Sequence, residues 1–355
     1  MSVHRSVRSA SSVQFPAFVR ALPSLRFVAS WAMTLPCVLS ASCQREPAFS
    51  VAVTQSAIAV SREVNPANLS QHVRELVAQR EKETPQTSLY WGNMKLRRVN
   101  AGQYIDSYLS AQGLTVVHER EDQQGVDTDN LYVDLPARSG SAHAAEYVLV
   151  SGHYDNWHVG ADDNASAVSV MLEAARILRT RSFLRTIRII AFDREEEGLV
   201  GSERYARLHQ TESVAALLNM DCVGYASHQP NSQSAPPGLA LRSVGDFLAI
   251  LASDVGTPAM SKVIRLSAEL PSPISILGLI APGTGHSPAA AAFLRSDHAA
   301  FWQQGVPALF LTDTADFRNP HYHRSSDVPD TLDYDFLQRS AQLVVAATAA
   351  LAEEE

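Results

Sequence analysis

Cysteine is scarce in this chain, which has only Cys37, Cys43 and Cys222 among its 355 residues. The first two lie within residues 1–43, so the rest of the chain contains a single cysteine. One cysteine cannot form an intramolecular disulfide, and it excludes a cysteine-rich zinc site. Any metal centre in the body of the chain must therefore be built from His, Asp and Glu side chains.

Clusters of positive charge are also missing, because no Lys/Arg-rich block occurs in the body of the chain. The formal net charge is -8, which argues against a nucleic-acid partner. The hydrophobic share of 46% and the charged share of 19% are those of a soluble globular protein. The chain's 355 residues are enough for one large domain or two ordinary ones, and we find no internal repeats.

The N-terminal segment lacks acidic residues and differs from the rest of the chain. Residues 1–26 contain arginines but no Asp or Glu, and the apolar segment 27–41 follows. That segment is short and interrupted by Pro36, so it predicts a secretory signal rather than a membrane span. Cys43 after Ala41-Ser42 resembles the lipidated cysteine of bacterial lipoproteins, although Ser40 fits that pattern poorly. We expect residues 1–43 to be a leader that directs export to the periplasm or anchors the chain by lipid to the bacterial envelope. The alternatives are an ordinary cleaved signal or a start codon set too early.

The remaining chain alternates between helical and strand patterns. Residues 44–65 are rich in Ser, Ala and Val without a clear period, and we expect a tether there. Helices are expected at 68–80, 95–112, 165–179, 201–209, 244–255 and 337–351, and strands at 114–118, 131–135, 146–151, 186–192, 217–220 and 306–312. Irregular segments are expected at 226–240 and 270–288, and the second should help to wall an active site. This alternation predicts an α/β layer sandwich in a single domain of residues 66–355.

The first candidate site follows the strand expected at 146–151. His153 and Asp155 come directly after it, and Asp162 and Asp163 precede Asn164, which can cap the next helix. Open α/β sheets bind their ligands at the carboxyl ends of the strands. Neutral imidazole and carboxylates suit a divalent metal of the zinc type. A lone His-x-Asp is more often a loop histidine paired with a carboxylate, so the hypothesis depends on the segments downstream.

Three further segments with acidic or histidine side chains each follow an expected strand. Glu195-Glu196-Glu197 follows 186–192, Asp221 follows 217–220, and the segment 319–327 with two histidines follows 306–312. Taken singly, they could be a solvated acidic loop, a turn cap and surface histidines. Adjacent glutamates repel each other, and a bound cation could neutralise one while its neighbour moves protons. Together the four segments form a coherent set at one edge of a sheet.

This set resembles peptidase family M28, the co-catalytic zinc aminopeptidases. The likeness covers residues 68–355, and its motifs are Gly152-His153-x-Asp155, Gly160-Ala-Asp-Asp-Asn-Ala-Ser166, Phe192-x-x-Glu195-Glu196-x-Gly198-Leu-x-Gly-Ser202, Asp221, Ser296-Asp-His-x-x-Phe301 and Tyr322-His323-x-x-x-Asp327. The resemblance implies a three-layer sandwich of the zinc-peptidase/phosphorylase-like type, with a mixed, mostly parallel central β-sheet flanked by helices. It also implies two Zn²⁺ ions per chain.

The resemblance further implies a ligand set for these two ions. One zinc would be held by His153 and Asp221, and the other by Glu196 and His323. Asp163 would bridge the two, and the peptide bond after it would be cis.

Catalytic roles are implied in the same way. Glu195 would be the general base, fixed in register by the Gly-Leu-x-Gly-Ser that follows, and Tyr322 would donate a hydrogen bond to the oxyanion. Asp155 would orient His153 through its other ring nitrogen. Asp297 and His298 would line or brace the substrate pocket, although a plain buried pair would fit equally well.

Two residues depart from the family's pattern. Arg194 stands where glycine is frequent, and Glu197 adds a third carboxylate where an apolar residue is common. Neither belongs to the implied ligand set. Arg194 could alter access to Glu195 or its basicity.

The function implied is a zinc-dependent exopeptidase, and an aminopeptidase in particular, acting through a zinc-bridged water on peptides with a free N-terminus. Local negative charge, chiefly of Glu195 and Asp221, suits the substrate amine and disfavours a carboxylate. The alternatives are a carboxypeptidase of the same family, a glutaminyl cyclase-like acyltransferase with one zinc, and a catalytically silent binding module tethered at the cell envelope. Metal count and turnover discriminate among them.

Overall fold

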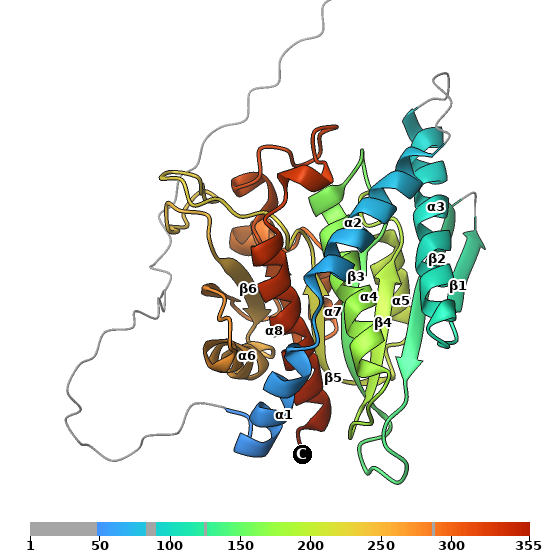
Figure 1. The fold of residues 1–355 in the computed structure, drawn as a ribbon, viewed down its shortest axis with the longest axis vertical. Helices are drawn as coiled ribbons and strands as arrows, with labels where there is room; N and C mark the ends of the chain where they lie inside the picture. The colour runs from blue at the N-terminus through green and yellow to red at the C-terminus, as the bar shows by residue number, and fades with distance from the viewer. Residues whose placement is uncertain (1–47, 83–89, 124–125, 286–287) are drawn as a thin grey trace, which may run out of the picture. The chain divides into compact units, whose positions relative to one another are not determined.

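The computed structural model describes residues 48–82, 90–123, 126–285 and 288–355, so the expected leader at 1–43 lies outside the described residues. Within these ranges, eight strands form one sheet in the order β1-β2-β4-β3-β5-β8-β6-β7 (Figure 1). The strands are β1 (Val117–Gln123), β2 (Val126–Leu135), β3 (Glu146–His153), β4 (Thr186–Phe192), β5 (Ser213–Met220), β6 (Leu248–Ser253), β7 (Ile276–Ala281) and β8 (Ala308–Thr312).

The centre of the sheet is a parallel block made of β4, β3, β5 and β8. On one side β2 runs antiparallel to β4, and on the other β6 runs antiparallel to β8 and parallel to β7. The expected mixed, mostly parallel sheet is therefore confirmed. Because the four central strands are parallel, their carboxyl ends lie at one edge, where an open α/β sheet places its ligands.

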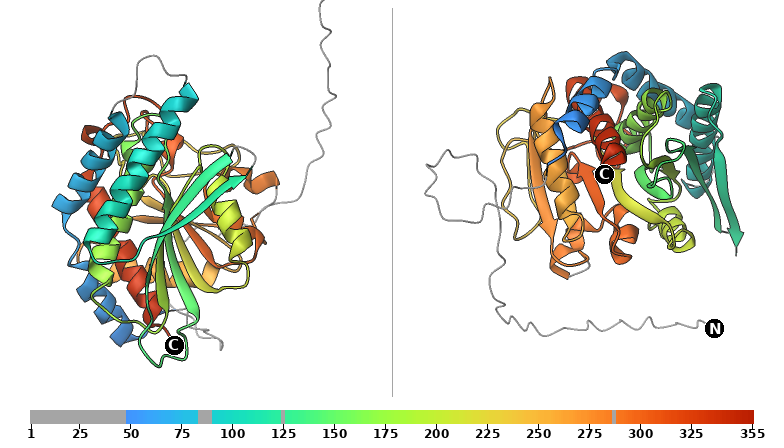
Figure 2. Two further views of the ribbon diagram at one scale, coloured as in Figure 1. Left: turned by 90° about the vertical axis from the view of Figure 1, so that its right-hand side faces the viewer. Right: turned by 90° about the horizontal axis from the view of Figure 1, so that it is seen from below.

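Helices cover both faces of the sheet (Figure 2). The helices are α1 (Val51–Ser61), α2 (Pro66–Glu81), α3 (Tyr90–Ala111), α4 (Ala167–Leu178), α5 (Val200–Leu208), α6 (Thr257–Glu269), α7 (His298–Gln303) and α8 (Tyr334–Glu353). Helices α1, α2, α3, α4, α6 and α8 share one apolar core with the sheet, whereas α5 and α7 share a second core. Strand β3 shows how the layers form, because Val148 and Val150 point into the first core and Leu149 into the second. The three-layer α/β sandwich is thus confirmed. None of the helices in the described part of the chain has the length and apolarity that a membrane crossing requires.

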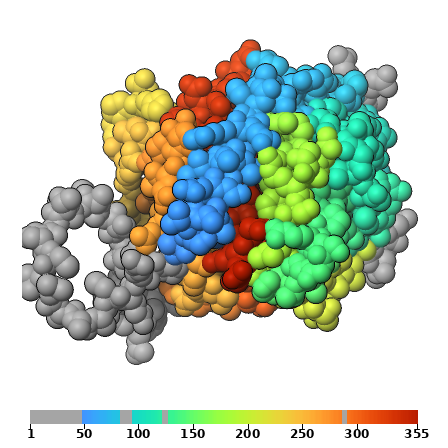
Figure 3. All heavy atoms as spheres, turned by 60° about the horizontal axis from the view of Figure 1, so that its bottom comes forward, coloured from blue at the N-terminus to red at the C-terminus, as the bar shows by residue number. Residues whose placement is uncertain are grey.

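The structure differs from the sequence analysis at residues 44–65, where we expected a tether. Residues 51–61 form α1, and Ser50 caps it by accepting a hydrogen bond from the backbone N–H of Val53. Ala57 and Val60 are buried, and α1 lies against α8 (Figure 3). The helix escaped notice because its apolar side chains are small and scattered among Ser and Thr, which leaves no clear period.

Two predictions in the second half of the chain are wrong in element type. The helix expected at 244–255 is β6, and the irregular segment 270–288 contains β7. The run Phe247-Leu-Ala-Ile-Leu-Ala252 is buried along its whole length, as expected for a strand covered on both faces. A short apolar run of this kind has no periodicity that separates a strand from a buried helix.

Candidate active site

The carboxyl ends of the four central strands bring the candidate residues together. His153 is the last residue of β3, Glu195 and Glu196 lie in the turn between β4 and α5, and Asp221 directly follows β5. His323 lies in the segment after β8. Asp163 comes from η1 (Ala161–Ser166), a short kinked segment between β3 and α4 in which Asp163 and Asn164 have non-helical backbone angles.

Asp163 lies between two groups of side chains. Its Oδ1 is 3.3 Å from Nε2 of His153, and its Oδ2 is 3.0 Å from Nε2 of His323. His153 Nε2 also lies 3.6 Å from Oδ1 of Asp221, whereas His323 Nε2 lies 3.0 Å from Oε2 of Glu196. The structure therefore places the other four ligands implied by the resemblance around the carboxylate of Asp163, in the two groups that the resemblance implies.

The backbone of η1 is fixed by hydrogen bonds that surround Asp163. The Asp163–Asn164 peptide bond is cis, as the resemblance implies. Asp327 accepts hydrogen bonds from the backbone N–H groups of Asp162 and Asp163, and Asn164 donates to the carbonyl of Met220 and accepts from the N–H of Cys222. These bonds hold Asp163 against the end of β5.

Arg80 is a residue of the site that the sequence analysis missed. It is fully buried on α2 and donates to the carbonyls of Tyr154, Val159 and Gly160, which lie in the loop between His153 and η1. Gly160 has φ +65°, and a Cβ there would lie 2.2 Å from the carbonyl of Asp163, so only glycine fits. No sequence motif could have revealed Arg80, because its partners are backbone carbonyls, which leave no pattern of residue types.

Glu195 and Asp155 are connected through the backbone. The carboxylate of Asp155 accepts hydrogen bonds of 3.1 Å from the N–H groups of both Glu195 and Glu196. Nδ1 of His153 lies 3.2 Å from the carbonyl of Asp155 and 3.5 Å from its Oδ1. Asp155 therefore fixes the two glutamates as well as the histidine.

Arg194 points away from the ligands. Its guanidinium contacts Glu197 at 2.5 Å and the backbone carbonyl of Asp127 at 3.2 Å. The two departures from the family's pattern thus pair with each other. Asp193, in the same turn, accepts from Arg98 and from the backbone N–H of Asp129, which connects this turn to α3 and β2.

The buried acids of the site require positive charge. Burial raises the pKa of Glu195 well above its usual value, and burial with the nearby Asp163 raises the pKa of Glu196 to about 8. Within the described residues, His153 Nε2, Asp163 Oδ2 and Glu196 Oε1 are buried without a hydrogen bond of good geometry. Imidazole and carboxylate atoms that face one another without well-formed hydrogen bonds fit divalent metal ions of the zinc type. The residues present therefore fit the metals that the resemblance implies.

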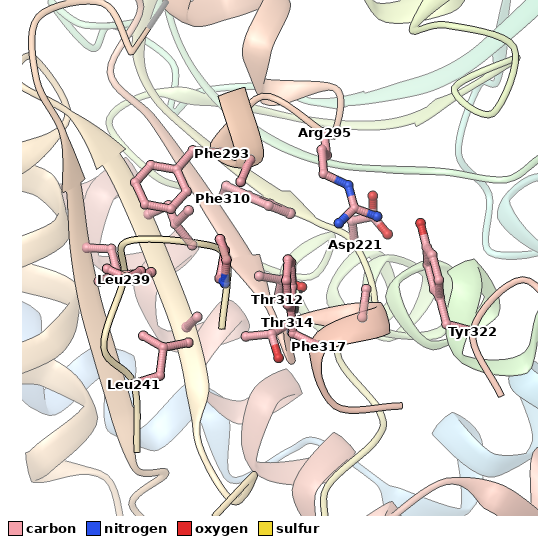
Figure 4. Close-up of a pocket in the computed structure, with 16 residues that line it drawn as sticks. Asp221, Leu239, Leu241, Phe293, Arg295, Phe310, Thr312, Thr314, Phe317 and Tyr322 are labelled. Atoms are coloured by element: carbon pink, nitrogen blue, oxygen red, sulfur yellow. Dashed lines mark hydrogen bonds between the residues drawn. The ribbon is translucent and has the colours of Figure 1, made fainter. Parts of the chain in front are cut away.

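An apolar pocket opens beside this cluster (Figure 4). It encloses about 580 Å³, counting the part open to solvent, and Asp221 and Tyr322 lie at one end of it. Its apolar side chains include Leu239, Leu241, Leu251, Leu279, Phe293 and Phe310. The segment 270–288 contributes Leu279, but most of the wall comes from residues that the sequence analysis did not place there.

Asp297 and His298 are both fully buried, and neither lines the pocket. His298 stacks on Phe310 at 4.2 Å between ring centroids, and its Nε2 bonds to the carbonyl of Phe293. It therefore braces the pocket wall from behind. Burial raises the pKa of Asp297 to about 7, although the nearby His153 opposes this shift.

Comparisons with known proteins agree with this geometry. The model of peptidase family M28 matches residues 130–273 and 275–348. An uncharacterized protein of Escherichia coli, YfbL, is 27% identical over 267 residues, which cover 69% of this chain and 76% of that protein. Leucine aminopeptidase 1 of Trichophyton rubrum is 26% identical over 341 residues, covering 86% of this chain and 83% of the relative.

Solved structures show the same fold. The LapA aminopeptidase of Legionella pneumophila superposes with a TM-score of 0.63 at 20% identity, covering 88% of this chain and 78% of that chain. The glutaminyl cyclase of Porphyromonas gingivalis superposes with a TM-score of 0.57 at 17% identity, covering 80% of this chain and 97% of the other. Because the fold is common to both activities, the side chains of the site must decide between them.

Proposed function

Because this chain belongs to peptidase family M28, we propose that it is a zinc-dependent aminopeptidase that hydrolyses the first peptide bond of peptides with a free N-terminus. The observation that carries this proposal is the position of Asp163, whose two oxygens face different histidines. Such a carboxylate suits a pair of metal ions better than a single one. Relatives named leucine aminopeptidase and zinc metalloprotease support the assignment.

We assign His153 and Asp221 to one zinc, Glu196 and His323 to the other, and Asp163 to both. Zinc, when bound, lowers the pKa of water toward about 7 and polarises a carbonyl group. The acidic cluster explains how this chain would hold two divalent ions. The positive charge of the ions offsets the repulsion among carboxylates that burial brings together.

Glu195 is the residue placed to move protons. It is buried, its Oε2 lies 4.0 Å from Nε2 of His153, and Asp155 fixes its backbone. We assign it to take a proton from the attacking water and to deliver that proton to the leaving amine. Tyr322, at the end of the apolar pocket beside Asp221, would donate a hydrogen bond to the oxyanion. Glu195 and Asp221 would also face the substrate's ammonium group.

The apolar pocket would receive the side chain of the first residue. Four leucines and three phenylalanines are among its lining residues, so a large apolar side chain would bury the most surface there. The name leucine aminopeptidase, which several relatives have, agrees with such a preference. We therefore propose leucine-like N-terminal residues as the preferred ones.

The test combines zinc content with turnover on the purified full-length chain. A panel of aminoacyl p-nitroanilides would be offered, with an N-terminal glutaminyl peptide beside it. We expect two zinc ions per chain and fastest release from the leucine substrate. One zinc ion with cyclisation of glutamine and no hydrolysis would overturn the proposal in favour of a glutaminyl cyclase.

We further propose that residues 1–43 direct export and that a lipid on Cys43 holds the enzyme at the bacterial envelope. The support is the sequence of the leader, with its basic start, apolar segment and small residues before Cys43. Cys43→Ser should move the protein from the membrane fraction to the soluble periplasmic fraction. Unchanged fractionation would count against the lipid anchor.

A further inference from the structure

One end of the apolar pocket is lined by charged and polar side chains. Of the described residues that line it, Arg295 is the basic one, and it stands at the end where Asp221 and Tyr322 lie (Figure 4). Its guanidinium faces these two residues, whereas Leu239, Leu241 and Phe293 lie toward the opposite end of the pocket. A cation beside an otherwise acidic metal cluster calls for an explanation.

Arg295 is held in place by its neighbours. Its Nη1 lies 2.8 Å from Oδ1 of Asp316, and the guanidinium lies over the rings of Phe317 and Tyr322 at 5.8 and 5.9 Å from their centroids. Solvent reaches this pair, because 40% of the Arg295 side chain and 46% of the Asp316 side chain are exposed. An exposed ion pair of this kind contributes little to stability. The stability of the fold therefore does not account for Arg295.

A guanidinium carries five N–H donors in a planar fork that matches a carboxylate. Arg295 contacts Asp316 through one terminal nitrogen, so other N–H groups of its guanidinium can bind a second anion. Asp221 also belongs to the clusters of acids and histidines around Asp163 that could hold metal ions. The site thus presents acidic groups to a substrate amine and a cation at the adjacent pocket mouth.

A dipeptide has the complementary charges. Its ammonium group lies on the first residue, and the carbon of its α-carboxylate is three bonds beyond the scissile carbonyl carbon. With the carbonyl beside Tyr322, the carboxylate would be within reach of the guanidinium that lies over the same ring. A carboxylate on the side chain of the first residue would instead lie in the apolar pocket, where burial of its charge is unfavourable.

We propose that Arg295 binds the α-carboxylate of the second residue, so that dipeptides are preferred over longer or amidated peptides. This inference rests on the proposed aminopeptidase function. Its competitor is a role through Tyr322 alone, in which Arg295 only positions the phenol. The two differ in a measurable way, because positioning of Tyr322 affects every substrate, whereas carboxylate binding affects only substrates that carry the carboxylate there.

The test compares Leu-Ala with Leu-Ala-NH₂ on the zinc-loaded full-length chain. The two substrates differ only in the charge at the position that Arg295 is assigned to bind. We expect kcat/KM to be roughly tenfold higher for Leu-Ala, since a charge-assisted hydrogen bond is worth about one such factor. In Arg295→Met the ratio should fall to near one, and in Arg295→Lys it should be intermediate.

Arg74→Met is the matched control, because Arg74, on α2, forms a similar 2.8 Å pair with an exposed aspartate, Asp330. It should keep the wild-type ratio. A wild-type ratio near one, or a ratio that stays high in Arg295→Met, would overturn the inference. If leucyl p-nitroanilide is not hydrolysed either, the proposed function itself fails, so the two failures are distinguishable.

Discussion

At the scale of single residues, the site depends on Asp163 and on the groups that fix it. Its carboxylate faces both histidines, and its backbone N–H donates to Asp327, which is buried. The motif around Asp163 was visible in the sequence because residue types at fixed spacings carry it. The contribution of Arg80 was not visible, because it acts on backbone carbonyls from a helix far upstream.

Glu195→Gln should separate metal binding from catalysis. Glutamine keeps the size of the side chain but cannot accept the proton, so kcat should fall by roughly 10²–10⁴-fold while the zinc content stays the same. Steady-state kinetics on leucyl p-nitroanilide with metal analysis of the same sample would measure both. Full activity in this variant would rule out the assigned role.

His323→Ala is the contrasting variant, since His323 is assigned to a metal and its removal leaves Asp163 and Glu196 without their shared partner. We expect the zinc content to fall from two ions to one. The side chain is 36% exposed, so its loss should create little cavity. An unchanged content of two zinc ions would exclude His323 from the ligand set.

At the scale of elements, the sequence predicted those whose pattern is local. Strand β4 was expected at 186–192 and is found there, because a β-branched run ends at Asp193. Strand β6 was mistaken for a helix because a strand that is buried on both faces shows no alternation of polar and apolar residues. It is covered by α6 on one face and lines the pocket wall on the other. Such cover is a property of the assembled fold and leaves no periodicity in the strand itself.

The connection of α5 to the edge of the sheet gives a pH-dependent prediction. His209 bonds to Glu119 of β1 at 2.7 Å and to Glu212 at 3.0 Å, and these carboxylates raise its pKa to about 9. A pKa raised by folding adds stability that is fully present below the unfolded value of about 6.5 and is lost as the pH rises through 9.

His209→Gln should therefore destabilise the protein by on the order of 1–2 kcal/mol at pH 6, allowing for partial solvent access. At pH 10 the pH-dependent part of this loss should vanish. Urea unfolding of the wild type and the variant at both values would measure it. An equal loss at the two pH values would show that His209 acts by stacking on Tyr205 instead.

At the scale of the molecule, the proposed metal ligands come from the carboxyl ends of four strands and from the segments between them, so bound ions would join these parts in one centre. Ions that bind the folded chain but not the unfolded one raise the stability, by about 4 kcal/mol at a concentration 1,000-fold above Kd. Bound ions would also relieve the repulsion among the buried carboxylates of the site. We expect the contribution of the metals to exceed that of any surface ion pair.

Removal of zinc by a chelator should lower Tm by on the order of 10 °C. Differential scanning calorimetry would follow the change. Added Zn²⁺ should restore Tm, whereas Mg²⁺ should not, because it prefers six oxygen ligands. Identical unfolding temperatures with and without chelator would contradict the assignment of metals to this cluster.

The place of β8 in the sheet has a consequence for a chain that is still being made. Translation delivers β6 and β7 before β8, yet β8 lies between β5 and β6. The last strand to leave the ribosome must therefore join the two parts of the sheet, and only the segment after it supplies His323. Products of premature termination before residue 308 lack both, so an unfinished chain carries no complete hydrolytic centre. Peptidase activity can therefore begin only after β8 has taken its place between β5 and β6.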